Sequence, residues 1–316
     1  MAESSQGFGI SVKLQENLCL LGQSQVFEDG ETLLKTLTGV NVSGKQIQRV
    51  SERYGALLEK KEAEEIKREE GLKTPKDHRL TYVMPDGSMV FTREEGWKEM
   101  KVGRIFQADS VVSIHPKRKQ IMESLYVCHL GEHSDFTAKM EHYIERYTKM
   151  ICIGDGAKWI WNWAEDSYPN MIKILDLYHA LEKLGTFAAI QYTDPQAKVI
   201  WIEQQKELLL TDQVRQVIKN VEALEARTAE ARKAKDALIS YYTNNESRMM
   251  YGTYKAKGYL VGSGAIESAH RNVVQQRLKL SGQRWNKSGA QQIVNLRAYQ
   301  KSNRWNEVVQ LIKNAA

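Results

Sequence analysis

The sequence predicts a mixed α/β fold in which a sheet has an antiparallel limb. Three consecutive segments between residues 80 and 130 alternate apolar and polar side chains, as half-buried strands do. Two short, continuously apolar runs follow at residues 150–153 and 171–175, with a helical segment between them. Short apolar strands of this kind belong in the centre of a sheet that is covered on both faces. The rest of the chain has helical apolar spacing.

The sequence pattern of residues 1–72 predicts a helical region. Its short helices are separated by Gly, Ser and Asn turns and are followed by the charged run "EKKEAEEIKREE". Residues 26–55 have the helix, tight turn and second helix of a DNA-binding helix-turn-helix, although an ordinary helical hairpin fits equally well. The charged run predicts a solvated connecting helix with i,i+4 ion pairs, and it marks a domain boundary.

The sequence pattern in the middle of the chain predicts secondary-structure elements in the order β-β-β-α-β-α-β. The first three strands are "RLTYVMPDGSMVF", "EGWKEMKVGRIFQADSVVSI" and "IMESLYVCHLG". A helix, "SDFTAKMEHYIERYTKM", leads into the apolar strand "MICIGD", the short helix "AKWIWNWAEDS" and the last strand "MIKILD". Residues 78–184 and 258–316 are expected to form one α/β core, and residues 185–257 an α-helical insertion within it.

Composition excludes several classes of protein. The 45 Lys and Arg residues against 39 Asp and Glu residues give a net charge of +6, which permits a polyanionic partner without requiring one. The three cysteines, Cys19, Cys128 and Cys152, form no CxxC pair, so neither a disulfide framework nor a zinc knuckle is indicated. No apolar run approaches the ~18 residues of a membrane span. These features are typical of a cytoplasmic protein without a membrane partner.

Acidic residues follow the predicted strands. Asp86 comes at the end of the first strand and Asp155 at the end of the fourth, where side chains point into the ligand-binding crevice of such a sheet. Each aspartate alone is more simply a turn residue. Glu267, in the first turn of a helix that starts at the Gly/Ser loop 262–264, supplies a third carboxylate. Two Asp and one Glu can hold two Mg²⁺ (or Mn²⁺) ions, which together promote in-line displacement at a phosphodiester.

Four stretches of the chain carry a family resemblance. "MPDGSMVFTREEGWKEMKVGRIF", "CIGDGAKWIW", "ILDLYHALEKL" and "GSGAIESAHRNVVQQRLKLSGQRWNKSGAQQIVNLRA" resemble bacterial insertion-sequence DDE transposases related to the Mutator-like group. The likeness runs from about Arg79 to the C-terminus, and the helical N-terminal segments are also similar. It implies a ribonuclease H-like mixed sheet, in the order β-β-β-α-β-α-β-α, with an α-helical insertion. It also implies that Asp86, Asp155 and Glu267 are the catalytic, metal-binding residues.

The resemblance places further residues around this site. Asp176 and His179 fall on the Asp-x-x-His signature of the group, and are expected to shape the site or contact the DNA strand. Asp176 as the second metal ligand, and His179 as a helix cap, remain alternatives. His270 either supports the metal ligands or is a solvated helix residue; a zinc site of Asp176, His179 and His270 is a weaker alternative. The expected DNA contacts are Arg271, Arg277, Lys279, Arg284 and Lys287.

Other residues suggest weaker hypotheses. Lys98, Lys101, Arg104 and residues 117–119 could track phosphates or lie on a solvated edge strand. Trp201 could stack on a base, although an aromatic residue on an amphipathic helix is more often part of the core.

The function implied by the resemblance is transposition. The protein would hydrolyse a phosphodiester at the ends of an insertion sequence, and the released 3′-hydroxyl would attack target DNA. The expected partners are double-stranded DNA and further copies of the chain, in a homodimer or higher oligomer at the bacterial nucleoid, with no small-molecule cofactor. Two alternatives share the three carboxylates: a ribonuclease H-fold nuclease and a catalytically degenerate, domesticated DNA-binding protein. A third alternative is a non-enzymatic helical adaptor, in which the three acidic residues would have no common role. Relatives are often longer at the N-terminus, so a truncated copy is a further expectation.

Overall fold

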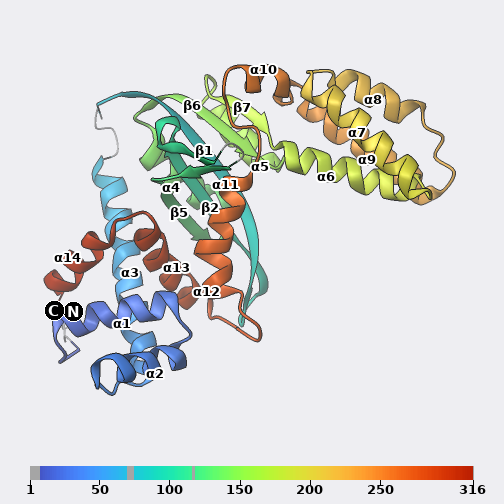
Figure 1. Cartoon of the computed structure of the whole chain (residues 1–316). Helices are drawn as coiled ribbons and strands as arrows, with labels where there is room; N and C mark the ends of the chain where they lie inside the picture. Colours follow the sequence, from blue (N-terminus) through green and yellow to red (C-terminus); the bar gives the residue numbers. More distant parts are fainter. Residues whose placement is uncertain (1–7, 70–74, 116–117, 316) are drawn as a thin grey trace. The chain divides into compact units, whose positions relative to one another are not determined.

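The computed structural model describes residues 8–69, 75–115 and 118–315, which form two compact units (Figure 1). Unit 1 comprises Met1–Thr81, Asp86–Lys149 and Ile266–Ala316, and unit 2 comprises Tyr82–Pro85 and Met150–Ala265. Among the described residues, no helix combines the length and the apolar character that crossing a membrane requires.

Helices from both ends of the chain build the core of unit 1. These are α1 (Val12–Ser24), α2 (Phe27–Thr38), α3 (Gly44–Glu69), α13 (Lys287–Lys301) and α14 (Trp305–Ala315). Leu18, Ile47, Tyr54, Leu296 and Ile312 are all buried in their shared apolar cluster. The segments predicted as a helix-turn-helix are α2 and α3, and α2 ends at Gly39 with φ 73°. Burial of apolar surface between helices that are distant in sequence therefore stabilises this N-terminal region.

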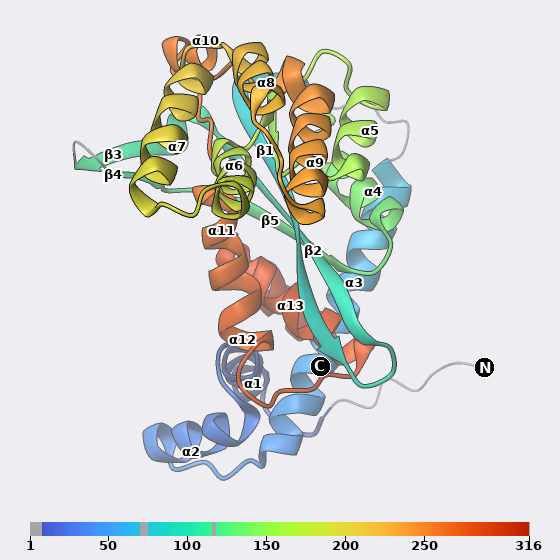
Figure 2. The ribbon, with the colours of Figure 1, turned by 90° about the vertical axis from the view of Figure 1, so that its right-hand side faces the viewer.

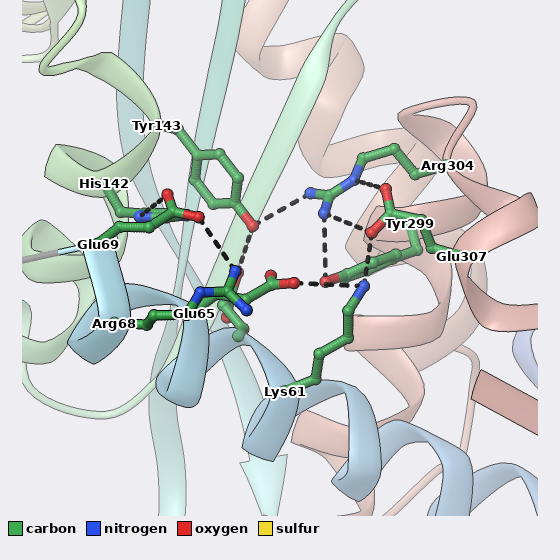
Figure 3. Close-up of polar contacts among 10 residues, drawn as sticks. Lys61, Glu65, Arg68, Glu69, His142, Tyr143, Tyr299, Arg304 and Glu307 are labelled. Atoms are coloured by element: carbon green, nitrogen blue, oxygen red, sulfur yellow. Dashed lines mark hydrogen bonds and ion pairs between the residues drawn. The ribbon is translucent and has the colours of Figure 1, made fainter. Parts of the chain in front are cut away.

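The charged end of α3 is less solvated than the sequence predicts. The expected i,i+4 pair of Lys61 and Glu65 is present, with 3.6 Å between Nζ and Oε1. Lys61 also reaches Glu307 of α14 at 2.8 Å, and Glu307 pairs with Arg304 at 2.6 Å (Figure 3). Arg304 in turn donates a hydrogen bond to the Tyr143 hydroxyl. The charged run therefore docks on the rest of unit 1 through a polar network, and periodicity alone gave no sign of these distant partners.

Close packing of α3 against α13 depends on Gly55. A Cβ atom at this position would lie 2.2 Å from the carbonyl oxygen of Gln292, which is backbone and cannot move aside cheaply. We expect Gly55→Ala to lower the free energy of unfolding by about 1–3 kcal/mol, because overpacking outweighs the better helix propensity of alanine. Urea unfolding measures this. The matched control is Gly185→Ala, since a Cβ there meets nothing within 4 Å; equal effects of the two substitutions would contradict the assignment.

The sheet confirms the mixed α/β prediction. Its strand order is β5-β2-β1-β6-β7, with β1 (Asp77–Thr92), β2 (Gly96–Gln107), β5 (Leu125–Leu130), β6 (Tyr147–Gly154) and β7 (Ile172–Leu175). β2 and β5 pair antiparallel, whereas β6 and β7 pair parallel. The helices between and after the later strands are α4 (His133–Ile144), α5 (Lys158–Asp166) and α6 (Leu177–Gln191). β6 and β7 are the strands predicted at residues 150–153 and 171–175. Residues 150–154 of β6 and 174–175 of β7 are buried.

The predicted second strand is wrong in its extent. β2 ends at Gln107, and a 3₁₀ turn at Ala108–Ser110 leads into β3 (Val111–His115). β3 pairs with β4 (Arg118–Ile121) in a separate two-stranded sheet (Figure 2). Alternation of apolar and polar residues continues through the turn, so the pattern could not show that the chain changes sheets.

Residues 185–257 are helical, and they follow the last strand of unit 2. The helices are α7 (Pro195–Leu210), α8 (Val214–Ala223), α9 (Ala229–Asn245) and α10 (Tyr251–Ala256), with a 3₁₀ turn at Glu246–Arg248. Asp194 caps α7 by accepting hydrogen bonds from the backbone of Gln196 and Ala197. Trp201 is buried and its ring lies 5.8 Å from that of Phe187. Trp201 is therefore a core residue.

Candidate active site

Two aspartates leave neighbouring parallel strands at the same edge of unit 2. Asp155 follows β6 and Asp176 follows β7, and the last residues of the two strands, Gly154 and Leu175, are paired. The backbone N–H of Asp176 donates to the carbonyl oxygen of Gly154 at 2.8 Å. The carboxyl ends of parallel strands are where α/β sheets place ligand-binding groups, so both aspartates lie at a position suited to chemistry.

Asp155 is partly exposed and lies in a tightly held turn. Its Oδ1 accepts a hydrogen bond from the N–H of Ala157 at 3.0 Å, and its carbonyl oxygen accepts one from the Tyr241 hydroxyl at 2.7 Å. Gly156 has φ 99°, and a Cβ there would lie 2.7 Å from the Tyr241 ring. Helix α9 of the insertion therefore fixes the turn that presents Asp155. Tyr241 carried no sequence signal that could have identified this role.

Asp176 is fully buried and its carboxylate is occupied by hydrogen bonds. It caps α6, accepting from the N–H groups of Tyr178 at 3.1 Å and His179 at 3.3 Å. It also accepts from the N–H of Ser263 at 2.8 Å and pairs with Nδ1 of His179. Burial acts to raise the pKa of Asp176, but the hydrogen bonds from His179 and Ser263 outweigh it and the pKa is lowered from 3.8.

These contacts give Asp176 a positioning role. They connect the start of α6 to the loop 262–264, which leads into α11 (Gly264–Ala269), the helix of Glu267. The loop itself approaches α6 closely, because a Cβ at Gly262 would lie 2.5 Å from the Tyr178 ring. Asp176, paired with His179, therefore holds the loop that precedes the helix of Glu267. The role of the Asp-x-x-His pair in shaping a catalytic site stays a prediction.

Asp86 and His270 lie together in unit 1. Oδ1 of Asp86 accepts a hydrogen bond from the N–H of Gly87 at 2.7 Å, and Oδ2 lies 3.1 Å from Nε2 of His270. The angles at this second contact are not those of a hydrogen bond, and Nδ1 of His270 also finds no hydrogen-bond partner among the described residues. His270 is buried, so it is not the solvated helix residue that the sequence left as an alternative.

The helix that carries Glu267 has an unusual turn. Glu267 is exposed on α11, and a π-helix at His270–Gln275 separates α11 from α12 (Gln276–Leu278). π-Turns of this kind frequently accompany functional sites. Because residues three apart are neighbours on a helix surface, Glu267 lies one turn from the histidine that contacts Asp86.

The predicted metal ligands are divided between the two units. Asp86 and Glu267 belong to unit 1 and Asp155 belongs to unit 2. All three are carboxylates, the donors that hard divalent cations prefer. In the described part of the chain, no group of three or more His, Cys, Asp or Glu side chains is arranged to hold a metal ion. The residues of the alternative zinc site separate in the same way, since His179 pairs with Asp176 in unit 2 and His270 lies against Asp86 in unit 1.

The predicted DNA contacts fall into two groups. Arg271, Lys279, Arg284 and Lys287 are exposed in unit 1. Arg277 is only 1% exposed, and its guanidinium lies 4.6 Å from the ring centre of Phe27 and 4.7 Å from that of Trp285. Its Nε donates to the carbonyl oxygen of Gly22 at 2.9 Å, and burial lowers its pKa to about 10. Arg277 is therefore a structural residue and is not placed to contact DNA.

Lys101 and Arg104, expected to track phosphates or to lie on a solvated edge strand, are also buried instead of exposed. Lys101 and Arg104 are buried in β2, where Lys101 donates to the carbonyl oxygen of Gly131 at 2.7 Å and Arg104 donates to Ser124 Oγ at 2.9 Å. Both side chains therefore stabilise unit 1 from within. Lys117 lies outside the described residues.

Comparison with known proteins shows a distant similarity. No protein-family model matches the chain. Over 306 residues the chain is 26% identical to the UPF0236 protein in vanSb 3′ region of Streptococcus gallolyticus. The match covers 92% of this chain and 64% of that protein, so the chain spans less than two thirds of the relative's length.

Proposed function

We propose that the protein is an insertion-sequence DDE transposase with a ribonuclease H-like catalytic domain, related to the Mutator-like group. The observation that carries the proposal is the placement of the carboxylates on the sheet. Asp86 lies in β1 and Asp155 directly follows β6, which is the neighbour of β1 in the order β5-β2-β1-β6-β7. The antiparallel limb, the parallel end and the late helix with Glu267 support this proposal.

The chain's own residues would prepare the site for phosphodiester chemistry. Asp86, Asp155 and Glu267 would hold the cations, with His270 beside Asp86 and the Tyr241 hydroxyl on the Asp155 turn fixing two of these carboxylates. When bound, Mg²⁺ or Mn²⁺ ions supply activation of the attacking oxygen and stabilisation of the leaving oxygen. Asp176 would hold the loop before Glu267 in place.

The reaction proceeds in two displacements of the same type. Water first attacks a phosphodiester at an element end, which breaks the bond to the 3′ oxygen and releases a 3′-hydroxyl. That hydroxyl then attacks a phosphodiester of target DNA, forming one bond and breaking one. The exposed Arg271, Lys279, Arg284 and Lys287 would neutralise the phosphates of the bound DNA. A homodimer or higher oligomer would hold both ends of the element.

The relative supports shared ancestry over most of this chain. The relative's name gives a position beside vanSb and no activity, so the proposed chemistry depends on the carboxylates and the sheet.

The test is cleavage and joining of DNA that carries the element's own ends. The protein is incubated with an end-labelled fragment and a plasmid target in Mg²⁺, in Mn²⁺ and in EDTA. We expect metal-dependent nicks with 3′-hydroxyl termini and joined products in the plasmid. Nicking without joining would instead support a ribonuclease H-fold nuclease, and end binding without nicking a degenerate DNA-binding protein.

A further inference from the structure

An exposed aromatic and basic surface lies on unit 1, where the β1–β2 hairpin meets the segment between α12 and α13. Trp97 is 62% exposed and Met89 is 44% exposed, although tryptophan is usually well covered. We call this area the hairpin surface, and it consists of Met89, Phe91, Trp97, Lys279, Arg284 and Lys287. The sequence motifs assigned no role to Trp97.

The hairpin surface is a fixed part of unit 1. Trp285, which is buried, pairs with Thr92 of β1 as an additional strand would. The N–H of Arg93 donates to the carbonyl oxygen of Trp285 at 2.8 Å, and the indole N–H of Trp285 donates to the carbonyl oxygen of Leu278 at 3.2 Å. Lys279 reaches across to Ser88 Oγ at 3.2 Å. The segment after α12 is therefore anchored to the hairpin at several points.

The rings of Phe91 and Trp97 pack against each other and leave the Trp97 indole exposed. Phe91 and Trp97 meet edge to face, with 5.4 Å between ring centres and 84° between ring planes. The Arg284 guanidinium lies 5.9 Å from the centre of the Phe91 ring. Phe91 thus supports the exposed indole from the side, and a cation lies beside the same pair of rings.

The charge of the hairpin surface favours a polyanion. Residues 88–98 and 279–287 contain five cationic side chains, Arg93, Lys98, Lys279, Arg284 and Lys287, against two carboxylates, Glu94 and Glu95. Glu95 is already paired with Lys98 at 2.6 Å and with Lys287 at 3.1 Å. Tryptophan and arginine are also frequent in protein interfaces, but an excess of three positive charges around a stacking platform is the signature of nucleic-acid binding.

We propose that the hairpin surface binds single-stranded DNA, with a base stacked on Trp97 and the adjacent phosphates on Lys279 and Arg284. That this strand belongs to the element end rests on the proposed function.

The test measures binding in EDTA, so that it does not depend on cleavage. A fluorescein-labelled 20-nucleotide single strand and its duplex are titrated with the full chain, with Trp97→Ala and with Trp97→Phe. Stacking contributes about 1–3 kcal/mol per base, so Trp97→Ala is expected to weaken single-strand binding about 5- to 160-fold. Trp97→Phe is expected to retain most of the binding. Met122→Ala is the matched control, because Met122 is 56% exposed in unit 1 outside the hairpin surface, and it should leave binding unchanged.

Salt dependence tests the phosphate contacts separately. Lys279→Ala and Arg284→Ala should each reduce the slope of log affinity against log salt by about 0.7. Unchanged single-strand binding by Trp97→Ala, or an equal loss in Met122→Ala, would overturn the proposal. A change in sedimenting mass in Trp97→Ala, with DNA affinity preserved, would also overturn it and make this surface a protein interface. Trp97-dependent binding by a protein that never cleaves would refute the proposed function and uphold this inference.

Discussion

Asp155→Asn is expected to abolish Mg²⁺-dependent cleavage of element ends while leaving the fold intact. Removing one carboxylate from a pair of metal sites forfeits several kcal/mol of transition-state stabilisation. Because each 1.36 kcal/mol added to the activation free energy slows a reaction tenfold, the cleavage rate should fall by about a thousandfold or more. The fold should persist because the asparagine oxygen can still accept the hydrogen bond from the N–H of Ala157.

Rates of nicking on a labelled end fragment, with circular dichroism of each variant, measure this prediction. Glu267→Gln should cause a loss of the same size, because the proposal gives both residues the same role. Asp194→Asn is the matched control, since Asp194 also accepts backbone hydrogen bonds at a helix start in unit 2. Activity of Asp155→Asn within tenfold of the parent would contradict the metal role of Asp155.

Asp176→Ala should have the largest effect on stability. The substitution removes a fully buried carboxylate and leaves the N–H groups of Tyr178, His179 and Ser263 without their acceptor. Breaking a buried charged pair by removing one partner costs about 3–5 kcal/mol, and we expect the free energy of unfolding to fall by about that amount. Because the loop before Glu267 is released, cleavage should fall as well.

The pH dependence of stability separates this role from simple packing. The pKa of Asp176 is lowered in the folded chain, so its ionised form stabilises the fold above the ordinary value of 3.8. That contribution is lost as the pH falls through the lowered pKa. Urea unfolding of the parent and of Asp176→Asn should therefore differ most at neutral pH and converge below about pH 3.8. A constant difference between the two proteins across this range would contradict the assignment.

Most strands could be predicted from the sequence because their signals are local, but Asp86, predicted at the end of the first strand, lies within β1. The mostly apolar β6 and β7 are each followed by an aspartate, and parallel pairing brings those strand ends to one edge. The Asp-x-x-His spacing likewise anticipated a contact, since residues three apart at a helix start are within reach of each other. The acceptor role of Asp176 toward Ser263 was not predictable, because it joins residues 87 positions apart.

Basic residues were the least predictable part of the candidate site. Arg277 stands among Arg271, Lys279 and Arg284 in a polar stretch, which predicts a surface position. Stacking against Phe27 and Trp285 makes its burial favourable, and these partners come from α2 and from the segment before α13. Trp97 shows the converse case, because tryptophan side chains are usually well covered and this one is exposed. Charge and hydrophobicity alone do not identify which side chains a distant segment will cover.

The most direct test of the proposed metal site is a crystal structure of the protein with an element-end duplex and Mn²⁺, using anomalous scattering to locate the metal. Ligation of Mn²⁺ by Asp86, Asp155 and Glu267 together is the predicted result. Mn²⁺ bound through Asp176 and His179, or ordered DNA without Mn²⁺ at these three carboxylates, would contradict it.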